Sequence, residues 1–175
     1  MQAYKKLYSE AQQDPEGFWL EQASRLDWFT PPKTAANVRK NGMADWFPDG
    51  KVNVSHLALD AQINAGRGDQ VALYYDSPVT NTQRHYTYSQ LKEEVAAFAG
   101  ALKAQGVNVG DRVVIYLPMI PQAAIAMLAC ARIGAIHSVV FGGFAAHELA
   151  VRIDDAKPKA IVTASCGVEV NKVLE

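Results

Sequence analysis

Two adjacent glycines, Gly142 and Gly143, stand between the strand-like run IHSVVF and the helix-like run HELAVRIDDAK. A glycine pair in this position can cradle a phosphate, let a cofactor lie against the bare backbone, or simply turn the chain. A phosphate loop needs the spacing G-x-x-x-x-G-K-[ST], which the sequence lacks. The segment GRGDQV, at 66–71, lacks the third glycine of a dinucleotide loop and does not follow an expected strand. The spacing therefore leaves a ligand-facing backbone and a plain turn open, and the turn is the commoner use of loop glycines.

The other polar residues predict no reaction by themselves. His137 has apolar neighbours and is typical of a core or edge histidine, while Asp154 and Asp155 are adjacent and diverge by about 100° on a helix. No Ser-His-Asp triad and no metal-ligand cluster can be assembled, so we expect neither a catalytic residue nor a metal site here. What remains is a pair of possible ligand-facing strand ends, at 141–144 and 165–172.

The composition indicates a packed, water-soluble domain. Of the 175 residues, 49% are hydrophobic and 20% are charged, and the formal net charge is −1. We expect no nucleic-acid or membrane partner, because either would favour a basic excess, and no apolar run reaches the ~20 residues of a membrane span. Two cysteines, Cys130 and Cys166, are too few for a disulfide framework and indicate a reducing compartment, the cytoplasm.

The first ~55 residues carry all three tryptophans and four of the eight prolines. One helix or two short ones are expected up to Phe29, with Asp14 as a cap and Pro15 at a first helical position. The following stretch, TPPKTAANVRKNGMADWFPDGKVNVS, shows neither helical nor strand periodicity. We interpret it as irregular chain pinned by aromatic anchors, wrapping over a neighbouring domain.

From residue 60 onward, strands and helices alternate. The sequence predicts a hairpin from 71–76 and 84–88, then a helix opened by a Thr87–Gln90 capping box. Three apolar strands follow, separated by helices that begin at Pro121 and near His147; the strands are 112–118, 136–141 and 160–164. Val- and Ile-rich strands joined through helices predict an α/β fold, with a helical and irregular cap before part of a mainly parallel sheet flanked by helices.

The stretch DRVVIYLPMIPQAAIAMLACARIGAIHSVVFGGFAAHELAVRIDDAKPKAIVTASCG closely resembles the acetyl-CoA synthetase group of the AMP-forming acyl-CoA synthetases. The segments DPEGFWLEQASRLDWFTPP and WFPDGKVNVSHLALD resemble the N-terminal cap of that group. The resemblance implies a cap at 1–59 and the first part of the AMP-binding, adenylate-forming domain at 60–175. It also implies that the chain is an N-terminal fragment.

Within the group, GRGDQVALYYDSPVT, IDDAKPKAIVTASCG and GVEVNKV resemble propionate–CoA ligase more than acetate–CoA ligase, which is the alternative. The family reaction uses ATP with Mg²⁺ to convert a carboxylate into an acyl-adenylate, which coenzyme A (CoA) then converts into acyl-CoA and AMP. The family's catalytic motifs lie beyond residue 175, so we expect this stretch alone to be inactive and to self-associate through exposed apolar surface. A non-catalytic α/β binding or scaffold module is the rival interpretation.

The resemblance also implies a site. In acetyl-CoA synthetases the FGGF segment packs against the nucleotide end of CoA, which would place Phe141, Gly142 and Gly143 there. A second CoA contact corresponds to four consecutive residues: Glu169, Val170, Asn171 and Lys172. The first and last are arginines in the acetate enzymes; Glu169 cannot pair with a phosphate, and Lys172 can do so only as a point charge.

Overall fold

The computed structural model describes residues 2–143, 145–169 and 172–174. The chain divides into two compact units, Met1–Asn53 and Val54–Glu175, each of which is described by itself.

The first unit begins with two helices, α1 (Gln2–Gln13) and α2 (Pro15–Ala23). The predicted cap between them is confirmed. The backbone N–H of Gly17 donates to Asp14 Oδ1 at 3.0 Å, and Pro15 occupies the first turn, where its missing N–H costs nothing.

The expectation of irregular chain after α2 is wrong for one segment. Strands β1 (Ala36–Val38) and β2 (Ala44–Trp46) form an antiparallel hairpin whose turn contains Asn41 and Gly42, the latter at a φ of +82°. Strands of three residues are too short to show an alternating pattern, so periodicity misses them. The Asn-Gly pair was the available signal, because that dipeptide favours tight hairpin turns.

The sequence predicted that aromatic side chains anchor this segment, and ring contacts do connect it to α2 and to the chain that follows α2. The Trp19 and Trp46 rings meet edge to face with centroids 5.3 Å apart, and those of Trp28 and Phe47 do so at 5.6 Å. The indole N–H of Trp28 donates to the Ala23 carbonyl at 2.7 Å. Trp28 and Phe47 are half-buried and Trp19 and Trp46 are exposed, so ring contacts at the surface help to hold this unit together.

The second unit opens with a helical segment that the sequence analysis did not assign. It contains two π-helical stretches, η1 (His56–Asp60) and η2 (Ile63–Arg67), with Gly66 at a φ of +79°. A π-helical turn holds more residues than an α-helical turn, so apolar residues do not recur at the usual 3.6-residue spacing.

The predicted hairpin and helix follow. Strands β3 (Val71–Ser77) and β4 (Thr82–Thr87) pair antiparallel, and helix α3 (Tyr88–Ala104) begins directly after them. The capping box is confirmed: Thr87 Oγ1 accepts from the Gln90 N–H at 3.2 Å, and Gln90 Oε1 accepts from the Thr87 N–H at 2.9 Å. Helix α3 therefore starts at a position that two side chains, three positions apart in the sequence, determine.

Replacing Thr87 with alanine is expected to lower the free energy of unfolding by about 1 kcal/mol, because the N–H of Gln90 loses its acceptor. Urea unfolding followed by circular dichroism measures the change. Thr87→Ser keeps the hydroxyl and is the control; an equal loss in both variants would show that the hydrogen bond is not responsible.

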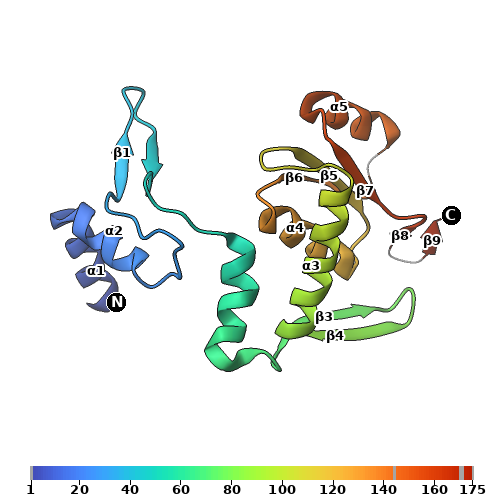
Figure 1. Ribbon diagram of the computed structural model, residues 1–175, viewed down its shortest axis with the longest axis horizontal. Coiled ribbons are helices and arrows are strands. Elements are labelled where there is room, and N and C mark those ends of the chain that lie inside the picture. Colours follow the sequence, from blue (N-terminus) through green and yellow to red (C-terminus); the bar gives the residue numbers. More distant parts are fainter. Residues whose placement is uncertain (1, 144, 170–171, 175) are drawn as a thin grey trace. The chain divides into compact units, whose positions relative to one another are not determined.

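A parallel sheet forms the centre of the second unit (Figure 1), which confirms the α/β fold class. Strand β5 (Arg112–Leu117) pairs in parallel with β6 (Ile136–Phe141) on one side and with β7 (Ala160–Thr163) on the other. The crossovers are α4 (Pro121–Arg132) and α5 (Ala146–Ala156). The chain continues into an antiparallel pair that was not predicted: β8 (Gly167–Glu169) and β9 (Lys172–Leu174).

The core lies where α3 and α4 cover one face of this sheet. Val113 and Ile115 from β5 are fully buried there with Val95 of α3 and Ala129 of α4. Alternate β5 residues point to this face and the others point to the opposite face, so a continuous apolar strand supplies buried side chains to both faces of the sheet. Among the described helices, none combines the length and apolar character needed to cross a bilayer.

Candidate functional site

A cavity of about 260 Å³ lies at the carboxyl ends of the parallel strands. Its lining comes from the end of β5, the turn after β6, and the end of β7 with the residues that follow. The lining residues are Tyr116, Leu117, Pro118, Gly142, Thr163, Ala164, Ser165, Cys166 and Gly167. Open α/β sheets bind ligands at this edge, because the loops that leave the strands diverge there and expose backbone groups.

Gly142 has a structural reason to be glycine. A Cβ atom built on it would lie 2.8 Å from the Leu117 carbonyl oxygen and 3.3 Å from the Pro118 nitrogen. Both are backbone atoms at the end of the central strand, so neither can move aside without disturbing the sheet. The close approach of two backbones therefore explains Gly142 without a ligand.

The remaining residues predicted at the CoA site are placed as follows. Phe141 ends β6, and Gly143 follows Gly142 in the same turn and is exposed. Glu169 ends β8 and stands opposite Lys172, the first residue of β9, in the antiparallel register. Val170 and Asn171 lie outside the described residues.

The two predicted strand ends meet at the cavity, but only in part. Gly142 from the first segment and Ser165–Gly167 from the second line the same space. Among the residues whose side chains the structure describes, the lining extends along the second segment as far as Gly167.

Sequence reasoning missed five of the nine lining residues: Tyr116, Leu117, Pro118, Thr163 and Ala164. In the sequence these residues resemble ordinary residues in or just after a strand, and they form part of no binding motif. Position was the available signal: each stands at or just beyond the carboxyl end of a parallel strand.

The two cysteines have different environments. Cys166 is half-buried at the cavity, whereas Cys130 is fully buried within α4. Burial raises the pKa of the Cys130 thiol to about 11, because the thiolate would lose its hydration. Both are free thiols, as the sequence predicted.

In the folded protein, Cys166 is expected to react with a thiol-specific reagent at neutral pH while Cys130 stays unmodified, because only the former is accessible. Peptide-resolved mass spectrometry after timed labelling distinguishes the two sites. Labelling in denaturant, where both should react, is the control. Equal labelling of both thiols under native conditions would contradict the burial of Cys130.

A cluster of charges joins three helical segments of the second unit. Asp60 accepts from Arg132 Nη1 at 2.7 Å and from Nη2 at 3.2 Å, and its other contact is Lys92 Nζ at 3.0 Å. These contacts, the Arg132 hydrogen bonds first, lower the pKa of Asp60 to about 2. A carboxylate that stays ionised against two cations at neutral pH is suited to holding helices together and is a poor proton acceptor.

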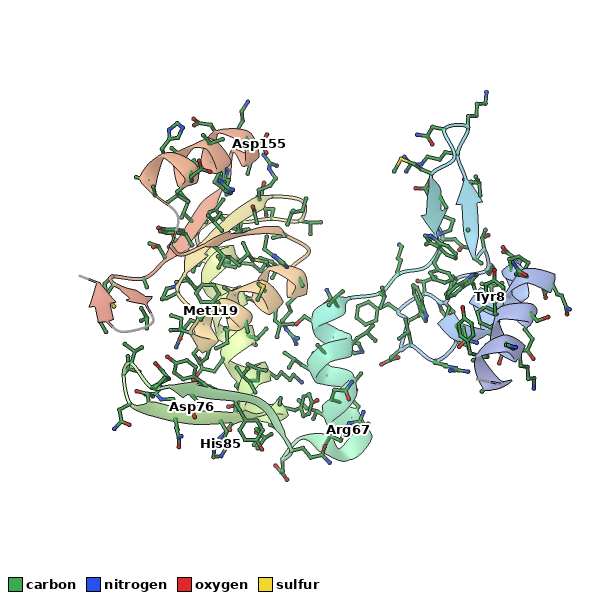
Figure 2. All side chains as sticks on the ribbon, turned by 180° about the vertical axis from the view of Figure 1, so that it is seen from behind. Tyr8, Arg67, Asp76, His85, Met119 and Asp155 are labelled. Carbon is green, nitrogen blue, oxygen red and sulfur yellow. The ribbon has the colours of Figure 1, made fainter. Side chains whose placement is uncertain are left out.

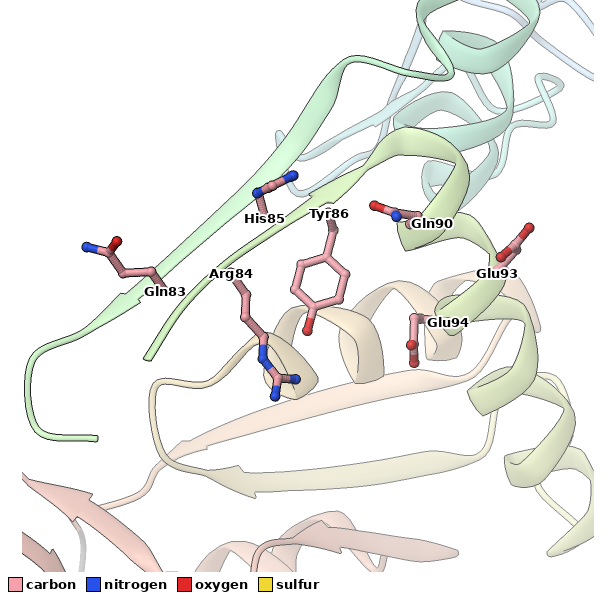
Figure 3. Close-up of a pocket in the computed structure, with 7 residues that line it drawn as sticks. All are labelled: Gln83, Arg84, His85, Tyr86, Gln90, Glu93 and Glu94. Atoms are coloured by element: carbon pink, nitrogen blue, oxygen red, sulfur yellow. The ribbon is translucent and has the colours of Figure 1, made fainter. Parts of the chain in front are cut away.

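A larger cavity, of about 470 Å³, lies between β4 and the start of α3 (Figure 3). The side chains of Arg84, Tyr86 and Glu94 point into the same space, while His85 points the other way. Except for Tyr86, its lining residues are exposed, and they do not stand at the ends of the parallel strands. Its larger volume alone does not make it the better candidate for a ligand site, so we take the cavity at the strand ends as the candidate site.

Across the described residues, no group of three or more His, Cys, Asp or Glu side chains is arranged to hold a metal ion.

Comparison with known proteins agrees with this fold. The sequence profile of the family described as AMP-binding enzyme matches residues 59–175. The profile described as acetyl-coenzyme A synthetase N-terminus matches residues 4–58. The solved structure of acetoacetyl-CoA synthetase from Streptomyces lividans superposes with a TM-score of 0.82 at 30% identity, covering 93% of this chain and 25% of that one.

Three curated relatives cover nearly the whole chain. An uncharacterized protein of Pseudomonas aeruginosa is 56% identical over 172 residues, which are 98% of this chain and 27% of the relative. The mitochondrial acyl-CoA synthetase short-chain family member 3 of Bos taurus is 49% identical, covering 98% of this chain and 25% of the relative. An acetyl-coenzyme A synthetase of Stutzerimonas stutzeri is 48% identical, covering 98% of this chain and 27% of the relative.

The chain thus spans about a quarter of the length of the curated relatives it matches. Its own parallel strands and their carboxyl-end cavity lie inside the longer of the two matched regions, which extends over more than half of the sequence. By its sequence and by its fold, this chain belongs to the AMP-binding enzyme family.

Proposed function

We propose that this protein catalyses ATP-dependent formation of a short-chain acyl-CoA, with propionate as its preferred carboxylate. In the first step a carboxylate oxygen attacks the α-phosphorus of Mg²⁺-bound ATP, forming an acyl-adenylate and releasing pyrophosphate. In the second, the sulfur of CoA attacks the acyl carbon, and AMP leaves. The family match and the synthetase names of the relatives support this reaction.

The observation that carries the proposal for this chain is the cavity at the carboxyl ends of β5 and β7. In the proposed arrangement the nucleotide end of CoA lies against the backbone of Phe141, Gly142 and Gly143. Gly143 is exposed, so a ligand can approach its peptide group without meeting a side chain. The proposed second contact runs through the residues from Glu169 to Lys172.

We assign no catalytic residue and no metal ligand to the chain. We propose that residues 1–59 form a cap and that residues 60–175 form the first part of the adenylate-forming domain.

Acetate is the second candidate substrate, supported by the acetyl-coenzyme A synthetase of Stutzerimonas stutzeri at 48% identity. The resemblance of GRGDQVALYYDSPVT and neighbouring segments to propionate–CoA ligase favours propionate. Our prediction of a cytoplasmic location rests on the two free thiols. The mammalian relatives named mitochondrial suggest the alternative compartment.

The test uses the protein expressed from its complete reading frame and supplied with ATP, Mg²⁺, CoA and one carboxylate at a time. We expect AMP and acyl-CoA to form, with kcat/KM for propionate about tenfold or more above that for acetate, because one methylene in an apolar pocket is worth that much. A higher kcat/KM for acetate would identify an acetate–CoA ligase. Formation of neither product with any short-chain carboxylate would leave the non-catalytic binding module as the better proposal.

A further inference from the structure

One wall of the strand-end cavity depends on a short strand. Strand β7 pairs with β5 through four residues only, from Ala160 to Thr163. The next residues, Ala164 to Gly167, complete the wall outside the β5–β7 ladder, and Gly167 begins β8, which pairs with β9. A ladder this short leaves the position of the wall sensitive to how the chain enters β7.

Arg112, the first residue of β5, holds that entry from two directions. Its backbone carbonyl accepts from the Lys159 N–H at 2.7 Å. Its guanidinium donates through Nε to the Ala156 carbonyl at 2.9 Å and through Nη2 to the Lys157 carbonyl at 3.3 Å. A weaker contact joins Nη1 to the Gly110 carbonyl at 3.5 Å. One residue therefore binds the whole link between α5 and β7.

The end of α5 needs such a partner. Lys157 adopts the left-handed conformation, at a φ of 45°, which is unfavourable for a residue with a Cβ. Asp154 and Asp155 stand in the last turn of α5, which has no basic residue of its own, and carboxylates there oppose the helix dipole. Figure 2 shows Asp155 at this end of the helix. The guanidinium of Arg112 supplies a cation and donors for carbonyls that the helix leaves unpaired.

The same face of β5 reaches the cavity. Arg112, Val114 and Tyr116 occupy alternating positions on the strand, so their side chains point to one side. Arg112 contacts the end of α5 at one end of this row, and Tyr116 lines the cavity at the other.

We propose that Arg112 is a positioning residue for the strand-end cavity. By holding the link between α5 and β7, it determines where β7 places Thr163 to Gly167, and so the wall against which CoA lies. The part of this inference that concerns CoA rests on the proposed function, whereas the part that concerns the cavity wall does not.

The test uses the protein from its complete reading frame with Arg112→Ala and Arg112→Lys. The control is Arg84→Ala, which removes an exposed arginine from another strand. Cys166 reports the position of the wall and Cys130 reports the integrity of the core, both by peptide-resolved thiol labelling. The KM for CoA and the kcat are measured on the same samples.

In Arg112→Ala the labelling rate of Cys166 is expected to rise about threefold to tenfold while Cys130 stays protected, because the opening is local. The KM for CoA should rise by about the same factor with kcat within about twofold of its original value. Arg112→Lys should restore part of both effects, since an ammonium can reach a carbonyl but cannot bridge several in a fixed geometry.

A second variant tests the cause. Lys157→Gly removes the left-handed strain, so the turn should form with less help, and Arg112→Ala should have a smaller effect on Cys166 in that background. An effect of unchanged size would contradict the role assigned to this turn.

The outcomes separate the two proposals. If Cys166 labelling in Arg112→Ala equals that in Arg84→Ala, or if Cys130 becomes reactive in parallel, the positioning role is wrong. If Cys166 labelling rises and the KM for CoA does not, the wall is positioned by Arg112 but is not the CoA site. Absence of any synthetase activity overturns the proposed function and leaves the labelling result to decide the positioning role.

Discussion

Replacing Gly142 with alanine is expected to lower the free energy of unfolding by about 2–3 kcal/mol, a typical cost of overpacking against atoms that cannot move. The new methyl group would lie 2.8 Å from the Leu117 carbonyl oxygen, within the backbone of the central strand. Relief would require the end of β6 to separate from β5. Urea unfolding of the wild-type and variant proteins, followed by circular dichroism, measures the loss.

Gly100→Ala is the matched control. A Cβ built on Gly100 meets nothing within 4 Å, and the residue is exposed on α3. Alanine there should raise the free energy of unfolding by about 0.5–1 kcal/mol, because it restricts the unfolded chain and favours helix. If both variants change the free energy of unfolding alike, the close approach of the Gly142 backbone to the Leu117 carbonyl is not present. A raised KM for CoA with unchanged stability would instead indicate that a side chain at position 142 obstructs the ligand and not the packing of the strands.

Asp60→Asn is expected to lower the free energy of unfolding by about 2–3 kcal/mol, less than the 3–5 kcal/mol found when a fully buried pair is broken. The Asp60 side chain is 14% exposed, but its partners Arg132 and Lys92 are 27% and 38% exposed, so water screens part of the loss. Asparagine keeps the shape and removes the charge, which leaves two cations facing a neutral amide. The measurement is again urea unfolding at neutral pH.

The same carboxylate makes stability depend on pH in the acidic range. Its pKa is about 2 in the folded protein and 3.8 ordinarily, so the unfolded chain binds the proton more readily. The contribution is therefore fully present above about pH 4 and is lost as the pH falls towards 2, with a total of about 2 kcal/mol. The difference in unfolding free energy between the wild type and Asp60→Asn should shrink over this window.

Asp155→Asn supplies the control for both experiments. Asp155 is exposed at the C-terminal end of α5 (Figure 2), where its charge opposes the helix dipole. Its removal should change the free energy of unfolding by no more than about 0.5 kcal/mol, and in the stabilising direction if at all. A loss equal to that of Asp60→Asn, or a difference that persists unchanged at pH 2, would contradict the role assigned to the cluster.

Much of the fold was predictable because the decisive residues are neighbours in the sequence. The capping box of Thr87 and Gln90 spans four residues, and Pro121 opens α4 by its own geometry. The apolar run 112–118 predicted a strand buried on both faces, since it lacks alternation, and β5 occupies Arg112–Leu117 of it. Local chemistry of this kind needs no knowledge of what packs against it.

The errors and omissions arose where local pattern was too short or irregular. The hairpin around Asn41 and Gly42 has three-residue strands, and the helical segment 56–67 departs from the 3.6-residue period. In both cases the period on which the prediction relied was absent, although the Asn-Gly pair was present.

The sequence by itself determined the order of the strands and helices from β3 to β7, the caps that begin α2 and α3, and a resemblance that extended over nearly the whole chain. Tertiary structure alone decided which distant residues meet: Asp60 with Arg132, 72 positions apart, and Arg112 with the end of α5, 44 positions apart. It also decided that Gly142 faces the Leu117 carbonyl. The reason is physical: capping and strand formation depend on a few adjacent residues, whereas these contacts depend on how helices cross over the sheet and on the register in which its strands pair.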